Sequence, residues 1–360
     1  MARLRMRIRS SPWQAWLVVV AGLAVVARLA LPHFIQGYLN RLLARQPTYQ
    51  GEVGDVGVSL YRGAYEIHDV DIRRRGTQSP VPFVAAPLID VSLQWGALLH
   101  GSVVGKLELD RPELNFVGGD PSERQTGTQG DWWHLVGKLF PVGLNRLEVR
   151  NGTLRFRNFH SKPPVNIRME HLDLVAENLQ NSRRSKEAHP PSIEMRGLFP
   201  HAGGMVMHAT LDPKAHAPDF AADLVLHSVS LPDLNDFLRA YAKLDANQGR
   251  IDLYAELRAD RGSFEGYAKP FLRDVSVLDW SQNVTKENVL STAWRAFAQG
   301  VLELFKNRQV GDVATRIPLR GTAKNPQGEF WPSLGNAFWN AFIQALAPRL
   351  ERGVRDGAAR

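Results

Sequence analysis

Histidine and carboxylate side chains are the groups in this chain that could do acid–base or metal chemistry, and their spacing is sparse. The eleven histidines are scattered. Two short runs come nearest to metal-ligand spacing: His68 with Asp69 and Asp71, and His171 with Asp173. Two residues apart on a strand, His171 and Asp173 would share a face, but two ligands do not make a metal site. We interpret both runs as strand surface and predict no metal site.

Motifs of enzymes and of nucleic-acid binding are also missing from the sequence. There is no cysteine, which excludes a disulfide, a thiol nucleophile and a cysteine-ligated zinc. The chain has no nucleophile elbow and no phosphate-binding loop. The glycines at 51, 54 and 57 have the wrong spacing for a dinucleotide fingerprint and predict close backbone approaches in strands. Aromatic residues do not alternate with basic ones. We predict a non-enzyme without cofactor and without nucleic acid.

The N-terminus has the pattern of a membrane anchor. Arg3, Arg5, Arg7 and Arg9 precede the nineteen-residue segment 13–31, in which only Gln14 and Arg28 are strongly polar. As a helix this segment would measure roughly 28 Å, close to the ~30 Å hydrocarbon core of a bilayer. Trp13 and Trp16 suit the membrane interface, and Arg28 can extend its charge toward water. The positive-inside rule places residues 1–12 in the cytoplasm and the chain after residue 31 across the membrane.

A cleaved signal peptide is the alternative to a retained anchor. The uninterrupted apolar stretch, residues 15–27, has the length of a signal-peptide core. Arg28 in the exit region and the lack of a small-x-small cleavage site favour the retained anchor. Both interpretations export residues 32–360. After a turn at Pro32, residues 33–45 predict a short helix that packs on the next domain.

The body of the chain, from about residue 49 to residue 269, predicts β-strands. Apolar residues alternate in three clear runs, which are Met205, Met207, Ala209 and Leu211; Phe220, Ala222, Leu224 and Leu226; and Ile251, Leu253, Ala255 and Leu257. Turn signals and short connections separate the runs. This pattern favours an antiparallel sheet with one apolar face over a parallel, doubly wound fold.

A weak internal repeat predicts that this sheet bends. LELDRPELNF (107–116) and LEVRNGTLRF (147–156) share a pattern in which the apolar phase slips by one residue across a proline or glycine. Such a slip turns the side chains to the other face unless a bulge absorbs it. Bulges of this kind let a sheet curl.

Helical patterns occur once within the body and again near the C-terminus. Residues 232–244 predict one amphipathic helix with Ser230 as its N-cap. Residues 283–306 and 332–350 predict two more helices, with a strand at about 313–323 between them. We therefore divide the chain into a basic tail (1–12), an anchor (13–31), a β-rich domain (32–280) and a closing, mainly helical segment (281–360).

Several of these segments resemble the AsmA-like proteins of Gram-negative envelopes, within a subgroup known only as a domain of unknown function. The segments are YRGAYEIHDVDI (61–72), LELDRPELNF (107–116), LNRLEVRNGTLRF (144–156), GYAKPFLRDVSVLD (266–279) and residues 317–351. The resemblance implies an inner-membrane helix, a periplasmic body made of an elongated, taco-like β groove, and a role in phospholipid transport for the outer membrane. It carries over no functional residue. Twelve to sixteen strands would stack to roughly 60–75 Å, which favours a partial conduit, shuttle or chaperone.

Two functions follow as hypotheses. In the first, a curled sheet holds phospholipid acyl chains on an apolar lining, for which the candidates are Met205, Met207, Leu224, Leu226, Leu253 and Leu257. In the second, the same face is a closed core, and the protein is a structural or assembly factor that contacts outer-membrane proteins or an envelope complex. The sequence assigns no oligomeric state.

The net charge of +8 fits a membrane orientation better than nucleic-acid binding. Four of these charges lie in residues 1–12 and two more in residues 349–360. The remaining residues, nearly the whole chain, carry a net charge of only +2. The body is therefore close to neutral.

Overall fold

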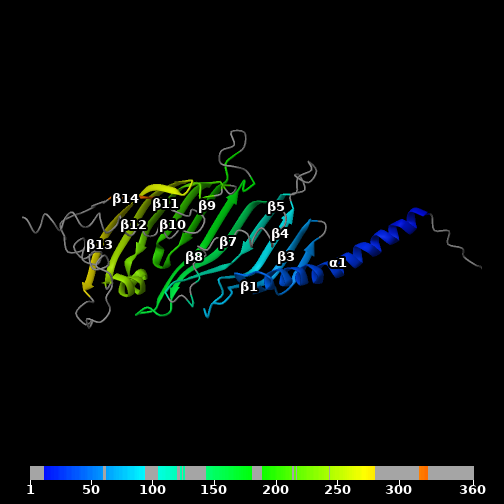
Figure 1. Ribbon diagram of the computed structural model, residues 1–360, viewed down its shortest axis with the longest axis horizontal. Helices are drawn as coiled ribbons and strands as arrows, with labels where there is room; N and C mark the ends of the chain where they lie inside the picture. Colours follow the sequence, from blue (N-terminus) through cyan, green and yellow to red (C-terminus); the bar gives the residue numbers. More distant parts are fainter. Residues whose placement is uncertain are drawn as a thin grey trace, which may run out of the picture.

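One large β-sheet runs through the protein, and a long helix projects from one end of it (Figure 1). The computed structural model describes residues 12–59, 62–93, 104–119, 122, 123, 125, 143–180, 189–212, 215, 217–242, 244–279 and 316–322. Within these residues the fold is mainly β with few helices, as the alternating apolar pattern predicts.

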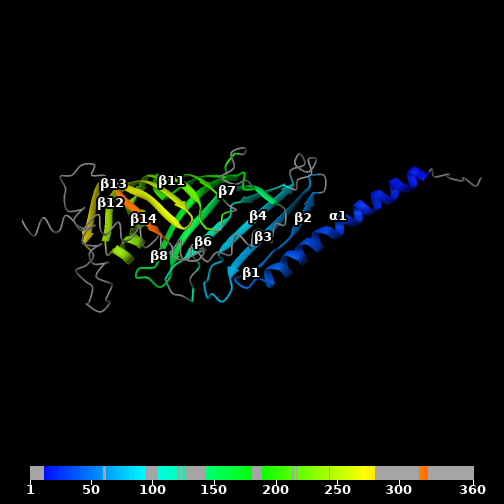
Figure 2. The same ribbon diagram turned by 45° about the horizontal axis from the view of Figure 1, so that its top comes forward.

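The sheet has fourteen strands. The first seven are β1 (Tyr49–Glu52), β2 (Val56–Ser59), β3 (Ala64–Arg74), β4 (Val84–Leu93), β5 (Val104–Asp110), β6 (Glu113–Val117) and β7 (Gly143–Asn158). The others are β8 (Val165–Glu177), β9 (Ser192–Leu198), β10 (Gly204–Leu211), β11 (Phe220–Ser230), β12 (Leu244–Asp260), β13 (Ser263–Asp279) and β14 (Ile317–Thr322). They follow one another across the sheet almost in chain order, and the sheet twists and curls toward its β12–β14 end (Figure 2).

The prediction of a fully antiparallel sheet is wrong at one place. β5 and β6 both pair with β7 in parallel, whereas every other described pairing is antiparallel. The connection between Val117 and Gly143 is long enough to return the chain to the end of the sheet at which β5 begins. Local alternation cannot show this, because it fixes the face of a residue and not the direction of the next strand.

The predicted bends are present, and they form a crease across the sheet. β5 and β6 lie end to end against β7 and are separated at Arg111, whose φ is +48°. The β7–β8 register shifts on either side of Gly152. Further residues with positive φ interrupt their strands and continue the crease: Asp69 in β3, Asn151 in β7, His171 in β8, Ser228 in β11, Gly249 in β12 and Asp274 in β13. The sheet therefore bends at bulges that recur from strand to strand.

Neighbouring polar side chains hold two of these bulges. The Asn151 backbone N–H donates to Asp173 Oδ1 (2.9 Å), and His171 Nδ1 lies 2.8 Å from Asn151 Oδ1. In β11, the Ser228 N–H donates to Asp252 Oδ1 (2.6 Å). Asp173 thus binds the backbone of β7 and His171 contacts the Asn151 side chain, and the described residues contain no group of three side chains that could hold a metal ion.

The helix α1 (Pro12–Ala44) is continuous through Pro32, where the sequence predicted a turn between two helices. Proline removes one helical hydrogen bond and crowds the preceding turn. The helix continues because helix-forming residues flank the proline and its last turns are fixed by packing on the sheet: Leu39 and Leu43 are almost fully buried.

The N-terminal half of α1 projects beyond the sheet (Figures 1 and 2). Of the thirteen exposed large apolar side chains among the described residues, ten lie on α1, including Trp13 and Trp16. Arg28 is also exposed. No helix in the described ranges was found to be long and apolar enough to cross a membrane. The assignment of residues 13–31 as a membrane span stays a prediction.

The helix predicted at 232–244 is present as three consecutive short turns: η2 (Leu231–Leu234), α4 (Asn235–Phe237) and η3 (Leu238–Ala242). Ser230 precedes them, but its side chain makes no capping hydrogen bond. β14 lies within the strand predicted at about 313–323. Arg3, Arg5, Arg7 and Arg9, and the two helices predicted at 283–306 and 332–350, lie outside the described residues.

Candidate functional site

Two rows of apolar residues cross the sheet on one face, which we call the apolar face. Each residue in a row is the cross-strand partner of the next, so all of them point to the same side. The first row crosses eleven strands: Val56, Ile67, Ile89, Leu109, Val149, Leu174, Met195, Met207, Leu224, Ala255 and Ala268. The second crosses twelve: Val58, Tyr65, Val91, Leu107, Leu147, Ala176, Ile193, Ala209, Ala222, Leu257, Gly266 and Leu319. Neither row contains a charged residue.

The six lining candidates from the sequence all lie on this face. Met207 and Leu224 belong to the first row and Leu257 to the second. Leu226 pairs with both Met205 and Leu253, so these three form a shorter row beside the first. Met205 is buried, with 8% of its surface exposed, and the other five are half-buried. The face is thus only partly covered around these residues.

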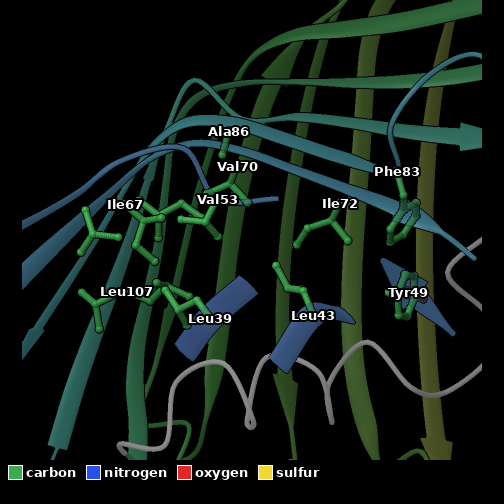
Figure 3. Packing of buried hydrophobic residues seen from close by; sticks show 13 residues of the cluster. Leu39, Leu43, Tyr49, Val53, Ile67, Val70, Ile72, Phe83, Ala86 and Leu107 are labelled. Atoms are coloured by element: carbon green, nitrogen blue, oxygen red, sulfur yellow. The ribbon is translucent and has the colours of Figure 1, made fainter. Parts of the chain in front are cut away.

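The last turns of α1 cover the opposite end of the apolar face. Leu39 and Leu43 pack against a cluster that extends from Tyr49 to Leu107 (Figure 3). Asn40 fixes the helix to the sheet by two hydrogen bonds with Val53 between β1 and β2: its Oδ1 accepts the Val53 N–H (2.9 Å), and its Nδ2 donates to the Val53 carbonyl (3.3 Å). Burial in this cluster raises the pKa of Tyr65 to about 12.

The helical turns from Leu231 to Ala242 cover a second region. Phe237 stacks edge-on against Phe156 of β7, with 6.5 Å between ring centroids. Asn235 exchanges two hydrogen bonds with the Ala246 backbone, and Arg239 donates to both carboxylate oxygens of Asp245. These contacts anchor the turns to β12 beside the row of Met205, Leu226 and Leu253.

The reverse face of the sheet is charged. Between the two apolar rows, one row of residues points the other way: Glu66, Asp90, Glu108, Glu148, Val175, Glu194, His208, Asp223 and Glu256. Basic side chains pair with these carboxylates. Lys106 contacts Glu108 (2.8 Å) and Glu148 (2.9 Å), and Arg150 contacts Glu148 (2.8 Å). The hydrogen bond from Lys106 is the main cause that lowers the pKa of Glu148 to about 2.

A cavity of about 270 Å³ lies on the charged face over β11–β14. Its walls include Asp223, Glu256 and Tyr267, and the Tyr267 hydroxyl donates to Glu256 Oε1 (2.5 Å). The Arg316 guanidinium lies 3.9 Å from the centroid of the Tyr267 ring. The described walls of the cavity are mostly polar or charged.

Sequence reasoning missed most of the two rows and one polar pair. Strand alternation was clear only in β10–β12, because bulges break the pattern elsewhere, and the rows follow from strand order and register. His201 Nδ1 lies 2.5 Å from Asp233 Oδ1, next to the apolar face. They are 32 residues apart in the chain, and no local pattern joins them. The sequence places Asp233 in the helix predicted at 232–244 and contains no signal for its contact with His201.

Comparison with protein-family models and with curated proteins found no match for this chain.

Proposed function

We propose that this protein is a non-enzymatic, membrane-anchored lipid-handling protein that holds phospholipid acyl chains on its apolar face. The observation that carries the proposal is the continuity of the two apolar rows, which cross at least eleven strands without a charge. With neighbouring strands about 4.8 Å apart, the second row extends roughly 50 Å. The role is in outer-membrane homeostasis, with the body in the periplasm, as the AsmA-like resemblance implies.

The chemistry of the rows suits acyl chains of varied length. Apolar burial stabilises a bound chain by about 0.8 kcal/mol per methylene group and needs no specific polar contact. Met195 and Met207 face each other in the first row, next to Leu224. Methionine is flexible and adapts to different apolar partners. This composition supports loose, repeated contact along the sheet rather than one selective pocket.

The projecting part of α1 supports attachment to an inner membrane. Its exposed tryptophan, leucine and valine side chains would lie against lipid, and the continuous helix leads directly to the β1–β5 end of the sheet. In this arrangement the apolar rows begin beside the helix that enters the membrane. Membrane fractionation of the full chain tests this part: we expect recovery with the membrane that resists high salt, whereas release by salt would contradict it.

Lipid binding is tested by purifying the full chain in mild detergent and identifying bound lipid by mass spectrometry. We expect stoichiometric phospholipid in the wild type and at least a fivefold loss in Leu224→Glu, because a charge in the first row makes burial of an acyl chain costly. Val225→Glu is the matched control. Val225 is the next residue on β11, is equally half-buried, and pairs with Val206 and Tyr254 on the charged face. Equal loss in both variants, or wild-type protein free of lipid, would contradict the proposal.

A structural or assembly role is the second candidate. Within the described residues β14 pairs only with β13, and its other edge could accept a strand from an outer-membrane protein. The same purification separates the two functions. Lipid-free protein that holds a stable protein partner, unaffected by Leu224→Glu, would favour assembly.

A further inference from the structure

A cavity of about 230 Å³ lies where β9 leaves β8. β9 pairs with β8 only from Glu170 onward, so residues 165–169 of β8 have no partner on that strand. Residues 166–168 form one wall of the cavity, Phe199, Pro200 and His201 another, and Asp233 of η2 the third. The separation of the two strands thus creates the space, and the helical turns after β11 close one side.

Asp233, in the wall of this cavity, has one unsatisfied carboxylate oxygen. Its side chain is only 9% exposed, and its Oδ1 lies 2.5 Å from His201 Nδ1. Its Oδ2 is buried and has no hydrogen-bond partner among the described residues. A buried carboxylate oxygen without a donor is unfavourable, so a ligand that brings an N–H donor would be bound at this point.

The cavity also borders the apolar face. Phe199, in its wall, packs against the buried cluster of Met169, Leu172 and Met205. Met205 is one of the lining candidates, so polar and apolar binding surfaces meet at this point. A volume of about 230 Å³ lies below the ~300–1,000 Å³ of pockets that enclose a whole drug-sized ligand. The space therefore suits a headgroup, with attached chains outside it on the apolar face.

We infer that this cavity selects phospholipids whose headgroup carries a primary ammonium beside the phosphate. The ammonium would donate to the Asp233 carboxylate, and Arg168 in the opposite wall would bring positive charge to the phosphate. A quaternary ammonium has no N–H to donate, and a glycerol headgroup has no positive charge, so both bind less well. This inference rests on the proposed lipid-handling function and names the lipid class.

The test gives the full chain in detergent an equal mixture of phosphatidylethanolamine, phosphatidylcholine and phosphatidylglycerol with identical acyl chains. Bound lipid is then counted by mass spectrometry. We expect about tenfold enrichment of phosphatidylethanolamine in the wild type, which corresponds to about 1.4 kcal/mol. Asp233→Asn should abolish the enrichment. Asp236→Asn, which removes the same charge three residues along the helical turns and outside the cavity wall, should keep it.

Free headgroups provide a second arm that does not depend on the apolar face. Calorimetry with O-phosphorylethanolamine and with O-phosphorylcholine should show binding of the first only, lost in Asp233→Asn. If that variant does not fold, His201→Asn replaces it: His201 is exposed and has a φ of +55°, which asparagine tolerates. Unselective lipid binding that is still lost in Leu224→Glu would overturn the headgroup site and leave the acyl-chain proposal standing. Binding of O-phosphorylethanolamine by protein that holds no lipid would support the headgroup site and overturn the acyl-chain proposal.

Discussion

Asn151 and Ser228 hold a left-handed backbone conformation within strands, and in each case a carboxylate of the neighbouring strand accepts the backbone N–H. The two carboxylates, Asp173 and Asp252, lie at separate points along the sheet, and each binds the backbone of a bulge. Each accepts a hydrogen bond from a backbone N–H that the bulge leaves without a partner in the strand ladder. At this scale the bend of the sheet depends on a few short polar side chains.

Substitution of Asn151 tests this dependence. Asn151→Val should lower the free energy of unfolding by about 1–2 kcal/mol, because a β-branched residue disfavours the left-handed conformation. Asn151→Gly should change it by no more than about 0.5 kcal/mol, because glycine adopts that conformation freely. Urea unfolding of the full chain, followed by circular dichroism, measures both. A larger loss in the glycine variant would contradict the account.

Glu148 predicts a pH dependence of stability. Its folded-state pKa of about 2 lies below the usual 4.5, because Lys106 and Arg150 donate to its carboxylate. The stability from this difference is complete above pH 4.5 and is lost as the pH falls toward 2. At most it amounts to about 3 kcal/mol. Glu148→Gln should flatten the decline of stability between pH 5 and pH 2, measured by urea unfolding.

At the scale of elements, the central contact is between α1 and the sheet. Leu39 and Leu43 insert into the apolar cluster of β1–β5, and Asn40 fixes the same turn to the Val53 backbone. The helix is therefore docked to the sheet rather than joined by a loose linker. The membrane attachment that we propose would then hold the β1–β5 end of the apolar rows next to the bilayer.

Leu43→Ala should loosen this docking. Leu43 is 1% exposed, and truncation of a buried leucine to alanine lowers the free energy of unfolding by about 2–5 kcal/mol. Hydrogen exchange of the Val53 amide should speed up as the helix detaches. Phe34→Ala is the control on the same helix, because Phe34 is 65% exposed. Unchanged exchange at Val53 in Leu43→Ala would show that the helix does not depend on this contact.

The sequence predicts individual elements well and their arrangement poorly. Alternation identified β10, β11 and β12, and the phase slips in 107–116 and 147–156 predicted the bulges that the structure contains. The parallel pairing of β7 and the passage of α1 through Pro32 were missed. Both depend on contacts distant in the chain, as does the meeting of His201 with Asp233. Local patterns report which face a residue takes and not which strand lies beside it.

At the scale of the molecule, the sheet has two faces of opposite character from β3 to β12. Residues alternate between the apolar rows and the charged row, so adjacent positions on one strand report on opposite faces. The fold is in this respect a long amphipathic surface, with α1 at one end and the curl of β12–β14 at the other (Figure 2).

Site-specific photo-crosslinking to phospholipid tests the central claim most directly. A photoreactive amino acid is placed on the apolar face at Leu174, Met207 or Leu224, and on the reverse face at Val175 or His208, in the full chain reconstituted with phospholipid bilayers. We expect lipid adducts at the three apolar-face positions, spread over strands β8, β10 and β11, and at least fivefold fewer at the two reverse-face positions. Equal labelling of both faces, or labelling of neither, would contradict the proposal that acyl chains lie along the apolar rows.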